Sequence, residues 1–390
     1  MASESNTTFK EKWAGTSKER RQWAAHTVAT DHEMDAKLIF IEIVVDNPTL
    51  VEANIRAKRH ALGVGEPTAA DLRESQFRIK QYARVYVSLQ DDGSEDDLSY
   101  MKLYNYGGKV VTNRMHGYLR MRIAQFLTTV HTTPHVIYLS RHGQSEYNVL
   151  GKIGGNPPLS EAGSEYARRL GAWAPENICK ATPSDARFLA KLSLGSGAIE
   201  GAPSPVGESG ERRLVKARLW TSSLQRTILT AQHIPHPILP PSSVAYSLHE
   251  PPADFGENLY GLPVAHADEQ PEHAEGSWEQ MSPRVYRNLD EIFAGEYEGM
   301  RYEDIQERSP DEATLRSMDK IGYRYPRGES YFDILSRLDP LVHEMESYHE
   351  PLLIVSHQAV LRLLYAYLKG MPRSKAPKIE IPLHTVMKIT

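Results

Sequence analysis

Residues 135–140 read His-Val-Ile-Tyr-Leu-Ser, a short apolar run that is followed at once by Arg141, His142 and Gly143. An uninterrupted run of this kind predicts a buried strand. Open α/β sheets bind ligands beyond the carboxyl ends of their strands, so Arg141 and His142 stand where a site is expected. The arginine can hold a phosphoryl group there while the imidazole attacks phosphorus, and Gly143 lets the backbone approach that group. Alone, the triplet is a weak signal, because it also occurs by chance.

Two more predicted strands end in polar residues of the same kind. A strand over 217–221 leads to Arg226 at the start of a helix, and a strand over 352–356 leads directly to His357. Between them, Glu291 precedes a glycine turn and offers a carboxylate. Because the carboxyl ends of parallel strands meet at one edge of a sheet, we expect these side chains to converge on one pocket.

Strands and helices alternate throughout the chain beyond residue 134. Helices are predicted after Ser160 and over 223–233, 329–348 and 358–369. The alternation predicts an α/β fold with a mostly parallel sheet flanked by helices. Two stretches, about 195–210 and 235–280, are rich in glycine, proline or acidic residues, and we expect them to be surface insertions.

The first third of the chain has an alternation of its own. Its patterns predict strands over 37–45, 100–106 and 109–112, and helices over 49–61, 70–88 and 117–130. We therefore expect two domains, over 1–133 and 134–390.

The composition excludes several classes of protein. The 390 residues include 45 basic and 50 acidic side chains, so the chain has no cationic surplus. Its charge therefore does not indicate nucleic acid or an anionic membrane as a partner. The single cysteine, Cys179, excludes an internal disulfide and suits a reducing compartment. The apolar runs are too short to span a bilayer, and the first residues lack the apolar core of a signal peptide. We expect a cytoplasmic enzyme.

The chemistry-bearing residues together resemble the histidine phosphatase superfamily, and longer motifs resemble one family within it. These motifs are RHGQSEYNVLGKIGG at 141–155, RSMDKIGYRYPRGESY at 316–331, SHQAVL at 356–361 and PLHT at 382–385. They are similar to the phosphatase half of the bifunctional 6-phosphofructo-2-kinase/fructose-2,6-bisphosphatase family. The resemblance covers essentially all of 134–390 apart from the two insertions, and it implies a phosphoglycerate-mutase-like domain there.

The resemblance also implies a role for each matching residue. His142 would take the phosphoryl group from C2 of the sugar, and Glu291 would protonate the leaving oxygen and then activate water. Arg141, Arg226 and His357 would neutralise the three equatorial phosphoryl oxygens. Arg316 and Lys320, four apart on a helical turn, would face the 6-phosphate together. The full set implied at the phosphate and sugar sites is Asn148, Gly154, Tyr302, Arg316, Lys320, Tyr331, Gln358 and Arg362.

Residues 1–133 resemble the second half of the same family's kinase domain. Residues 6–8 and 18–21 are similar to the segment that follows the metal-binding strand of that domain. Arg78 and Tyr82 match positions that bind fructose 6-phosphate in the family, so the resemblance implies that they are the relic of a kinase sugar-phosphate site. The phosphate-loop pattern G-x-x-x-x-G-K-[ST] does not occur in the 390 residues. We therefore expect that the N-terminal part of the kinase domain is missing and that this chain has no kinase activity.

The leading interpretation is hydrolysis of fructose 2,6-bisphosphate through a phosphohistidine, with no metal or other cofactor. This reaction would control the level of a signal metabolite of glycolysis and gluconeogenesis. An alternative is a fragment of a bifunctional enzyme whose complete form also makes this compound from ATP and fructose 6-phosphate; only then would ATP and Mg²⁺ be needed. A third is an inactive sugar-phosphate sensor, against which the intact Arg141, His142 and Glu291 argue. The expected partners are a sugar phosphate and a second copy of the chain, joined through the kinase-like half.

Overall fold

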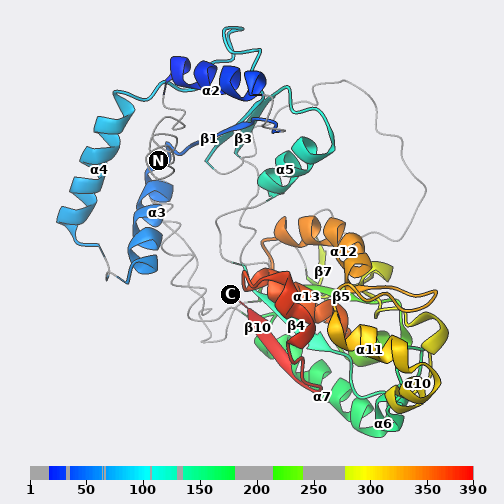
Figure 1. Ribbon diagram of the computed structural model, residues 1–390. Helices are drawn as coiled ribbons and strands as arrows, with labels where there is room; N and C mark the ends of the chain where they lie inside the picture. The colour runs from blue at the N-terminus through cyan, green and yellow to red at the C-terminus, as the bar shows by residue number, and fades with distance from the viewer. Residues whose placement is uncertain are drawn as a thin grey trace, which may run out of the picture. The chain divides into compact units, whose positions relative to one another are not determined.

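A computed structural model describes residues 17–31, 36–63, 65, 67–105, 108–129, 135–180, 214–239 and 277–389 (Figure 1). The insertion expected at 195–210 lies outside these residues, as do the segment at 6–8 and all but the two ends of 235–280. Compact units form on either side of a division between residues 132 and 133, and each is described by itself.

The first unit is built on a three-stranded sheet. Its strands are β1 (Phe40–Val44), β2 (Tyr100–Tyr104) and β3 (Lys109–Asn113), in the order β1-β2-β3. The pair β1 and β2 is parallel, and the pair β2 and β3 is antiparallel. The helices of this unit are α2 (Lys18–Thr30), α3 (Pro48–Ala61), α4 (Ala69–Ala83) and α5 (Tyr118–Thr129).

Alternation along β2 explains how this sheet is covered on both faces. Met101 and Leu103 point to one face and form a cluster with Ala124 of α5. Tyr100 points to the other face, where it joins a cluster that includes Ala25 of α2. Two different helices thus bury the two faces of one strand.

The second unit contains a five-stranded sheet in the order β10-β4-β9-β5-β8. The strands are β4 (Ile137–Arg141), β5 (Arg218–Thr221), β8 (Pro283–Val285), β9 (Leu352–Ser356) and β10 (Val386–Ile389). Only β10, at one edge, is antiparallel, which confirms the predicted mostly parallel sheet. Arg141 is in register with Ser356, and Thr221 with Val355, so three strands end side by side.

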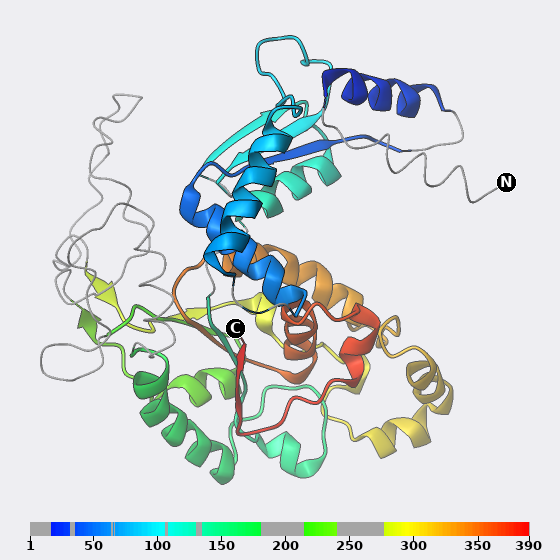
Figure 2. The same ribbon diagram turned by 90° about the vertical axis from the view of Figure 1, so that its left-hand side faces the viewer.

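Helices cover both faces of this sheet (Figure 2). Ile137, Leu139 and Ile354 pack against α12 (Tyr331–Glu346) and α13 (Gln358–Leu368). Tyr138 and Leu353, which alternate with them, pack against α7 (Glu161–Asn177) and α9 (Gln225–Ala231). The remaining elements are α6 (Glu146–Leu150), α10 (Tyr302–Arg308), α11 (Pro310–Met318), the short strands β6 (Ile238–Leu239) and β7 (Trp278–Glu279), and the 3-10 turns η2 (Arg287–Leu289), η3 (Gly295–Tyr297) and η4 (Arg373–Lys378).

Two expectations about helices were wrong in detail. The helix predicted over 70–88 ends at Ala83, and residues 85–89 are not helical. Leu89 is buried in the cluster that contains Tyr100 and Ala25 of α2. The helix that carries Arg316 ends at Met318, because Asp319 takes a non-helical conformation; Lys320 therefore lies in the following turn. Among the described residues, the helices are too short or too polar to cross a membrane.

Candidate active site

His142 follows β4 directly and is only 3% exposed. Its ring Nδ1 lies 2.7 Å from the carbonyl oxygen of Gly143. That oxygen can only accept, so Nδ1 carries the proton of the neutral ring and Nε2 keeps its lone pair. His142 lines a cavity of about 390 Å³, which we call the nucleophile cavity. The arrangement provides the unprotonated nitrogen that an attacking group needs.

Two arginines line the nucleophile cavity with His142. Arg141 is the last residue of β4, and Arg226 lies in the first turn of α9, where its Nη1 donates to the carbonyl oxygen of Gly155 at 2.8 Å. Within the described parts of the chain, the buried Nε of Arg141 has no hydrogen-bond partner, which leaves it able to donate to a bound anion. The site therefore offers two guanidinium groups to an oxyanion.

The same burial and charges keep the neighbouring histidine rings neutral. Burial, reinforced by the charges of Arg226 and Arg141, holds the pKa of His142 well below its usual range. Burial and the charges of Arg226 and Arg141 act in the same way on the pKa of His357. Both imidazoles are therefore uncharged near neutral pH.

His357 is fully buried at the end of β9, with its ring centroid 5.1 Å from that of His142. Arg226 donates from Nε to His357 Nδ1 at 3.2 Å, so the ring proton resides on Nε2. Nε2 in turn donates to the hydroxyl of Ser222 at 2.7 Å. The structure thus places both nitrogens of His357 against protein groups, one of which is the phosphate-binding candidate Arg226.

Glu291 lies on the chain between η2 and η3, and its carboxylate is directed at the N-terminus of α13. One oxygen accepts the backbone N–H of Gln358 and the other that of Ala359, both at 3.1 Å. These bonds satisfy two N–H groups that a helix start leaves unpaired, and they fix the direction of the carboxylate. Glu291 also lines the nucleophile cavity.

Asn148 and Gly154 complete one wall of the nucleophile cavity. Asn148 accepts the backbone N–H of Ser145 at 3.0 Å through its side-chain oxygen, which caps α6. Gly154 has φ of +67°, and a Cβ there would collide with the carboxylate of Glu298. The left-handed backbone conformation favours a glycine at this point of the wall.

The second group of predicted residues lines another cavity, of about 310 Å³. Arg316, Lys320 and Arg362 all face it, and we call it the cation cavity. Burial, together with the charges of Arg362 and Arg316, lowers the pKa of Lys320 to about 8. Three cationic side chains held this close are expected to bind an anion.

Tyrosine hydroxyls orient the guanidinium groups of the cation cavity. Arg316 donates to Tyr325 at 2.8 Å and to Tyr302 at 3.0 Å, and its guanidinium stacks on the Tyr302 ring. Arg362 donates to Tyr331 at 3.2 Å. These contacts restrict the arginines before any ligand binds.

The two cavities adjoin each other. Five residues line both of them: Glu291, Ile292, Tyr302, Tyr325 and Gln358. The structure therefore brings together all the residues predicted for the phosphatase site. His357 lines neither cavity but lies against His142 and Arg226. Arg78 and Tyr82 are exposed on α4 of the first unit and line neither cavity. No group of three or more potential metal ligands occurs among the described residues.

Three residues that contact the site were missed by the sequence reasoning. Ser222 binds His357, Thr230 accepts the backbone N–H of Gly143 at 2.9 Å, and Tyr325 binds Arg316. Tyr325 lies inside the quoted motif at 316–331, and Ser222 directly follows the strand predicted over 217–221, so position in the sequence was the available signal. Thr230, one turn along α9 from Arg226, had no signal beyond helical spacing.

Comparison with protein families gives two matches. Residues 137–185 and 272–390 match the histidine phosphatase superfamily (branch 1), and residues 14–134 match 6-phosphofructo-2-kinase. The first match includes His142, Glu291 and His357.

Individual relatives match nearly the whole chain. Proteins named 6-phosphofructo-2-kinase/fructose-2,6-bisphosphatase are 32% identical over 364 residues in Arabidopsis thaliana and 32% identical over 380 residues in Gallus gallus. The aligned part is 92% and 96% of this chain, but 38% and 62% of those proteins. The chain thus spans less than two thirds of the length of these relatives. Among solved structures, the α-ribazole phosphatase of Shigella flexneri aligns with a TM-score of 0.42 at 18% identity, over 65% of this chain and 90% of that one.

Proposed function

Because the chain belongs to the bifunctional 6-phosphofructo-2-kinase/fructose-2,6-bisphosphatase family, we propose that its second unit hydrolyses fructose 2,6-bisphosphate to fructose 6-phosphate and phosphate. The observation that carries this proposal is the pair of adjoining cationic cavities. One contains Arg141 and Arg226 beside the free Nε2 of His142, and the other contains three cations but no nucleophile. A sugar with two phosphates fits such a pair, since one phosphate is transferred and the other is only held.

In the first step, His142 Nε2 attacks the phosphorus of the 2-phosphate. A nitrogen–phosphorus bond forms as the bond from phosphorus to the sugar oxygen breaks, and Glu291 gives a proton to that oxygen. Arg141 and Arg226 stabilise the charge on the equatorial oxygens, which is the main contribution a protein makes to phosphoryl transfer. The Nδ1–H of His142 stays bonded to Gly143 and keeps the ring oriented.

In the second step, water attacks the phosphohistidine. Glu291, now ionised, takes a proton from the water as the new oxygen–phosphorus bond forms, and the electron pair of the broken bond returns to Nε2 of His142. His142 leaves as a neutral ring, the form that its burial beside Arg226 and Arg141 favours. No step in this sequence requires a metal or a cofactor.

The cation cavity binds the 6-phosphate, which remains on the product. Arg316, Lys320 and Arg362 neutralise it, and Tyr302, Tyr331 and Gln358 lie where they contact the sugar. The distance between the cavities then sets the specificity, because a sugar with a single phosphate loses half of the contacts.

The match of residues 14–134 to 6-phosphofructo-2-kinase favours a second candidate, in which the complete form of the enzyme also phosphorylates fructose 6-phosphate with ATP and Mg²⁺. We propose that this chain does not, because the phosphate-loop pattern is absent from its 390 residues.

The test is the release of phosphate from fructose 2,6-bisphosphate by the full chain. We expect turnover to fall by at least about 10³-fold in His142→Ala, since the nucleophile is removed. His343→Ala, at a buried histidine of α12 that lines neither cavity, is the matched control and should keep its activity. Unchanged turnover in His142→Ala would refute the proposal, and formation of fructose 2,6-bisphosphate from ATP by this chain would favour the second candidate.

A further inference from the structure

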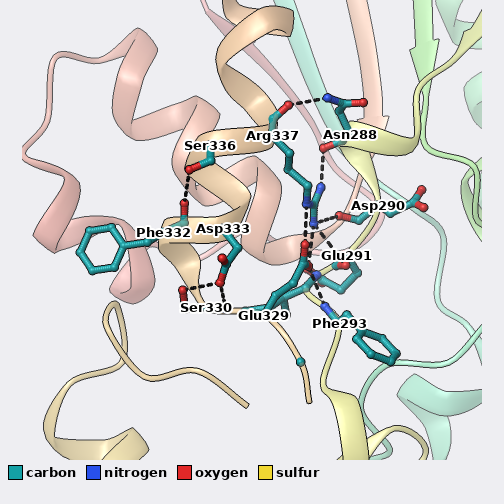
Figure 3. Close-up of polar contacts among 12 residues, drawn as sticks. Asn288, Asp290, Glu291, Phe293, Glu329, Ser330, Phe332, Asp333, Ser336 and Arg337 are labelled. Atoms are coloured by element: carbon teal, nitrogen blue, oxygen red, sulfur yellow. Dashed lines mark hydrogen bonds and ion pairs between the residues drawn. The ribbon is translucent and has the colours of Figure 1, made fainter. Parts of the chain in front are cut away.

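Arg337, on the second turn of α12, contacts the backbone of the loop that carries Glu291 (Figure 3). Its guanidinium donates to the carbonyl oxygens of Asn288, Asp290 and Glu291, the last two at 2.6 and 3.3 Å. Asn288 returns a bond, from its side-chain amide to the carbonyl oxygen of Arg337 at 2.6 Å. One side chain thus holds three carbonyl groups within four consecutive residues.

Glu329 pairs with Arg337 and contacts the other end of the loop, at Phe293 (Figure 3). Its carboxylate pairs with Arg337 at 3.1 and 3.2 Å and also accepts the backbone N–H of Phe293 at 3.0 Å. The backbone N–H of Glu329 donates to the carbonyl oxygen of Phe293 at 2.8 Å. The loop from residue 288 to residue 293, which we call the acid loop, is therefore tied at both ends.

The arrangement uses all three nitrogens of the planar guanidinium. Nε and Nη2 bind the two oxygens of Glu329, Nη1 binds Asn288, and Nη2 also reaches the carbonyl oxygens of Asp290 and Glu291. Lysine has three donors on one atom and cannot reach these acceptors together. The side chain is 19% exposed, so its bonds to charged and polar groups are only partly screened by water.

Arg337 does not line the nucleophile cavity or the cation cavity. It borders a third cavity, of about 660 Å³, which Gly154, Arg226 and Glu291 of the nucleophile cavity also line. Among the reactive residues, Glu291 is the one whose backbone Arg337 binds directly.

We propose that Arg337 is a positioning residue for Glu291, an inference that rests on the proposed function of that carboxylate. The N-terminus of α13 fixes the tip of the side chain, through Gln358 and Ala359, while Arg337 and Glu329 fix its backbone. With both ends held, the carboxylate keeps its direction towards the leaving oxygen. Without Arg337, the carbonyl groups of Asp290 and Glu291 lose their side-chain donor. The bonds from Ser223 to Asp290 and from Ser356 to Leu289 remain, but neither of them holds Glu291 itself.

The first test compares two substrates in the full-length variants Arg337→Met and Arg337→Lys. The sugar oxygen of fructose 2,6-bisphosphate needs a proton to leave, whereas p-nitrophenolate does not. We expect kcat/KM to fall by about 10²-fold with the bisphosphate and by less than about threefold with p-nitrophenyl phosphate. Inhibition by fructose 6-phosphate should not change, because the cation cavity is not touched.

The matched control is Arg324→Met. Arg324 also pairs with an acidic residue of α12, Asp333, at 2.5 Å, but it does not contact the acid loop. This variant should keep its kcat/KM for both substrates. In a Glu291→Gln background, Arg337→Met should add little to the loss with the bisphosphate, because the group that it positions is already gone.

The second measurement is amide hydrogen exchange, which does not depend on turnover. In Arg337→Met, exchange should accelerate at Phe293, Gln358 and Ala359 and stay unchanged in β4 and β9. Equal losses with both substrates, no loss with either, or unchanged exchange at Gln358 and Ala359 would overturn the inference. If His142→Ala were fully active, the proposed function would fail, and the exchange data alone would still decide whether Arg337 holds Glu291 in place.

Discussion

Two neutral histidines next to two arginines are the core of the site at the level of single residues. Arg226 links them, because its charge lowers the pKa of both rings and its Nε donates to His357. His142 keeps Nε2 free only because Gly143 accepts from Nδ1. The nucleophile therefore needs no separate base to deprotonate it near neutral pH.

Lys320 gives the site a pH dependence on the alkaline side. Its pKa is lowered to about 8, so it is charged below that pH and loses its proton, and its charge, as the pH rises through 8. We predict that kcat/KM for fructose 2,6-bisphosphate declines above about pH 8, because the cation cavity then holds two cations instead of three. The measurement is the pH profile of kcat/KM.

Lys320→Met is the diagnostic variant for this decline. It should reduce kcat/KM by about tenfold at pH 7, as expected for the loss of one charged hydrogen bond, and its profile should lack the decline near pH 8. A decline that persists unchanged in Lys320→Met would show that another group is responsible.

At the level of secondary-structure elements, α7 supports the loop after β4. Ser160, which caps α7, accepts the backbone N–H of Gly163 at 3.2 Å and donates to the carbonyl oxygen of Gln144 at 3.1 Å. A Cβ on Gly163 would lie 2.1 Å from the same carbonyl oxygen, so the first turn of α7 is packed against the loop that contains His142. The helix start and the nucleophile loop behave as one packed unit.

Two glycines of α7 allow this to be tested. Gly171 is as crowded as Gly163, since its Cβ would lie 2.4 Å from the carbonyl oxygen of His233, but it is two turns away from the loop. We predict that Gly163→Ala and Gly171→Ala both destabilise the protein by about 1–3 kcal/mol. Only Gly163→Ala should also lower kcat/KM of the folded protein, by tenfold or more, because it displaces Gln144. The measurements are urea unfolding and steady-state kinetics, and equal kinetic effects of the two variants would contradict this coupling.

The elements that sequence patterns predict well are those with long or strongly apolar runs. β4, β9 and α13 were expected within a residue or two, because each is a continuous buried pattern. The short α6 and the edge strand β10 were not expected, since five and four residues carry too little periodicity. The polar helix α2 was missed as well: its residues show no apolar face.

At the level of the whole molecule, the site depends on local charge and not on net charge. The chain carries −5 overall, yet six lysine and arginine side chains line the two adjoining cavities: Arg141, Lys152, Arg226, Arg316, Lys320 and Arg362. Strand ends could be predicted to converge, because parallel topology dictates it. The hydrogen bonds from Arg337 to the acid loop could not be predicted from the sequence. They join residues that are 46 to 49 positions apart in the chain, and no local motif marks the contact.

The proposed reaction requires a covalent phosphoryl group on one named atom. We would expose the full chain briefly to fructose 2,6-bisphosphate labelled at the 2-phosphate, quench it, and locate the label in the chain. We predict label on His142 that survives alkali, is lost in acid, and is absent from His142→Ala. Turnover of the bisphosphate with no labelled enzyme, or with label on a residue other than His142, would contradict the mechanism.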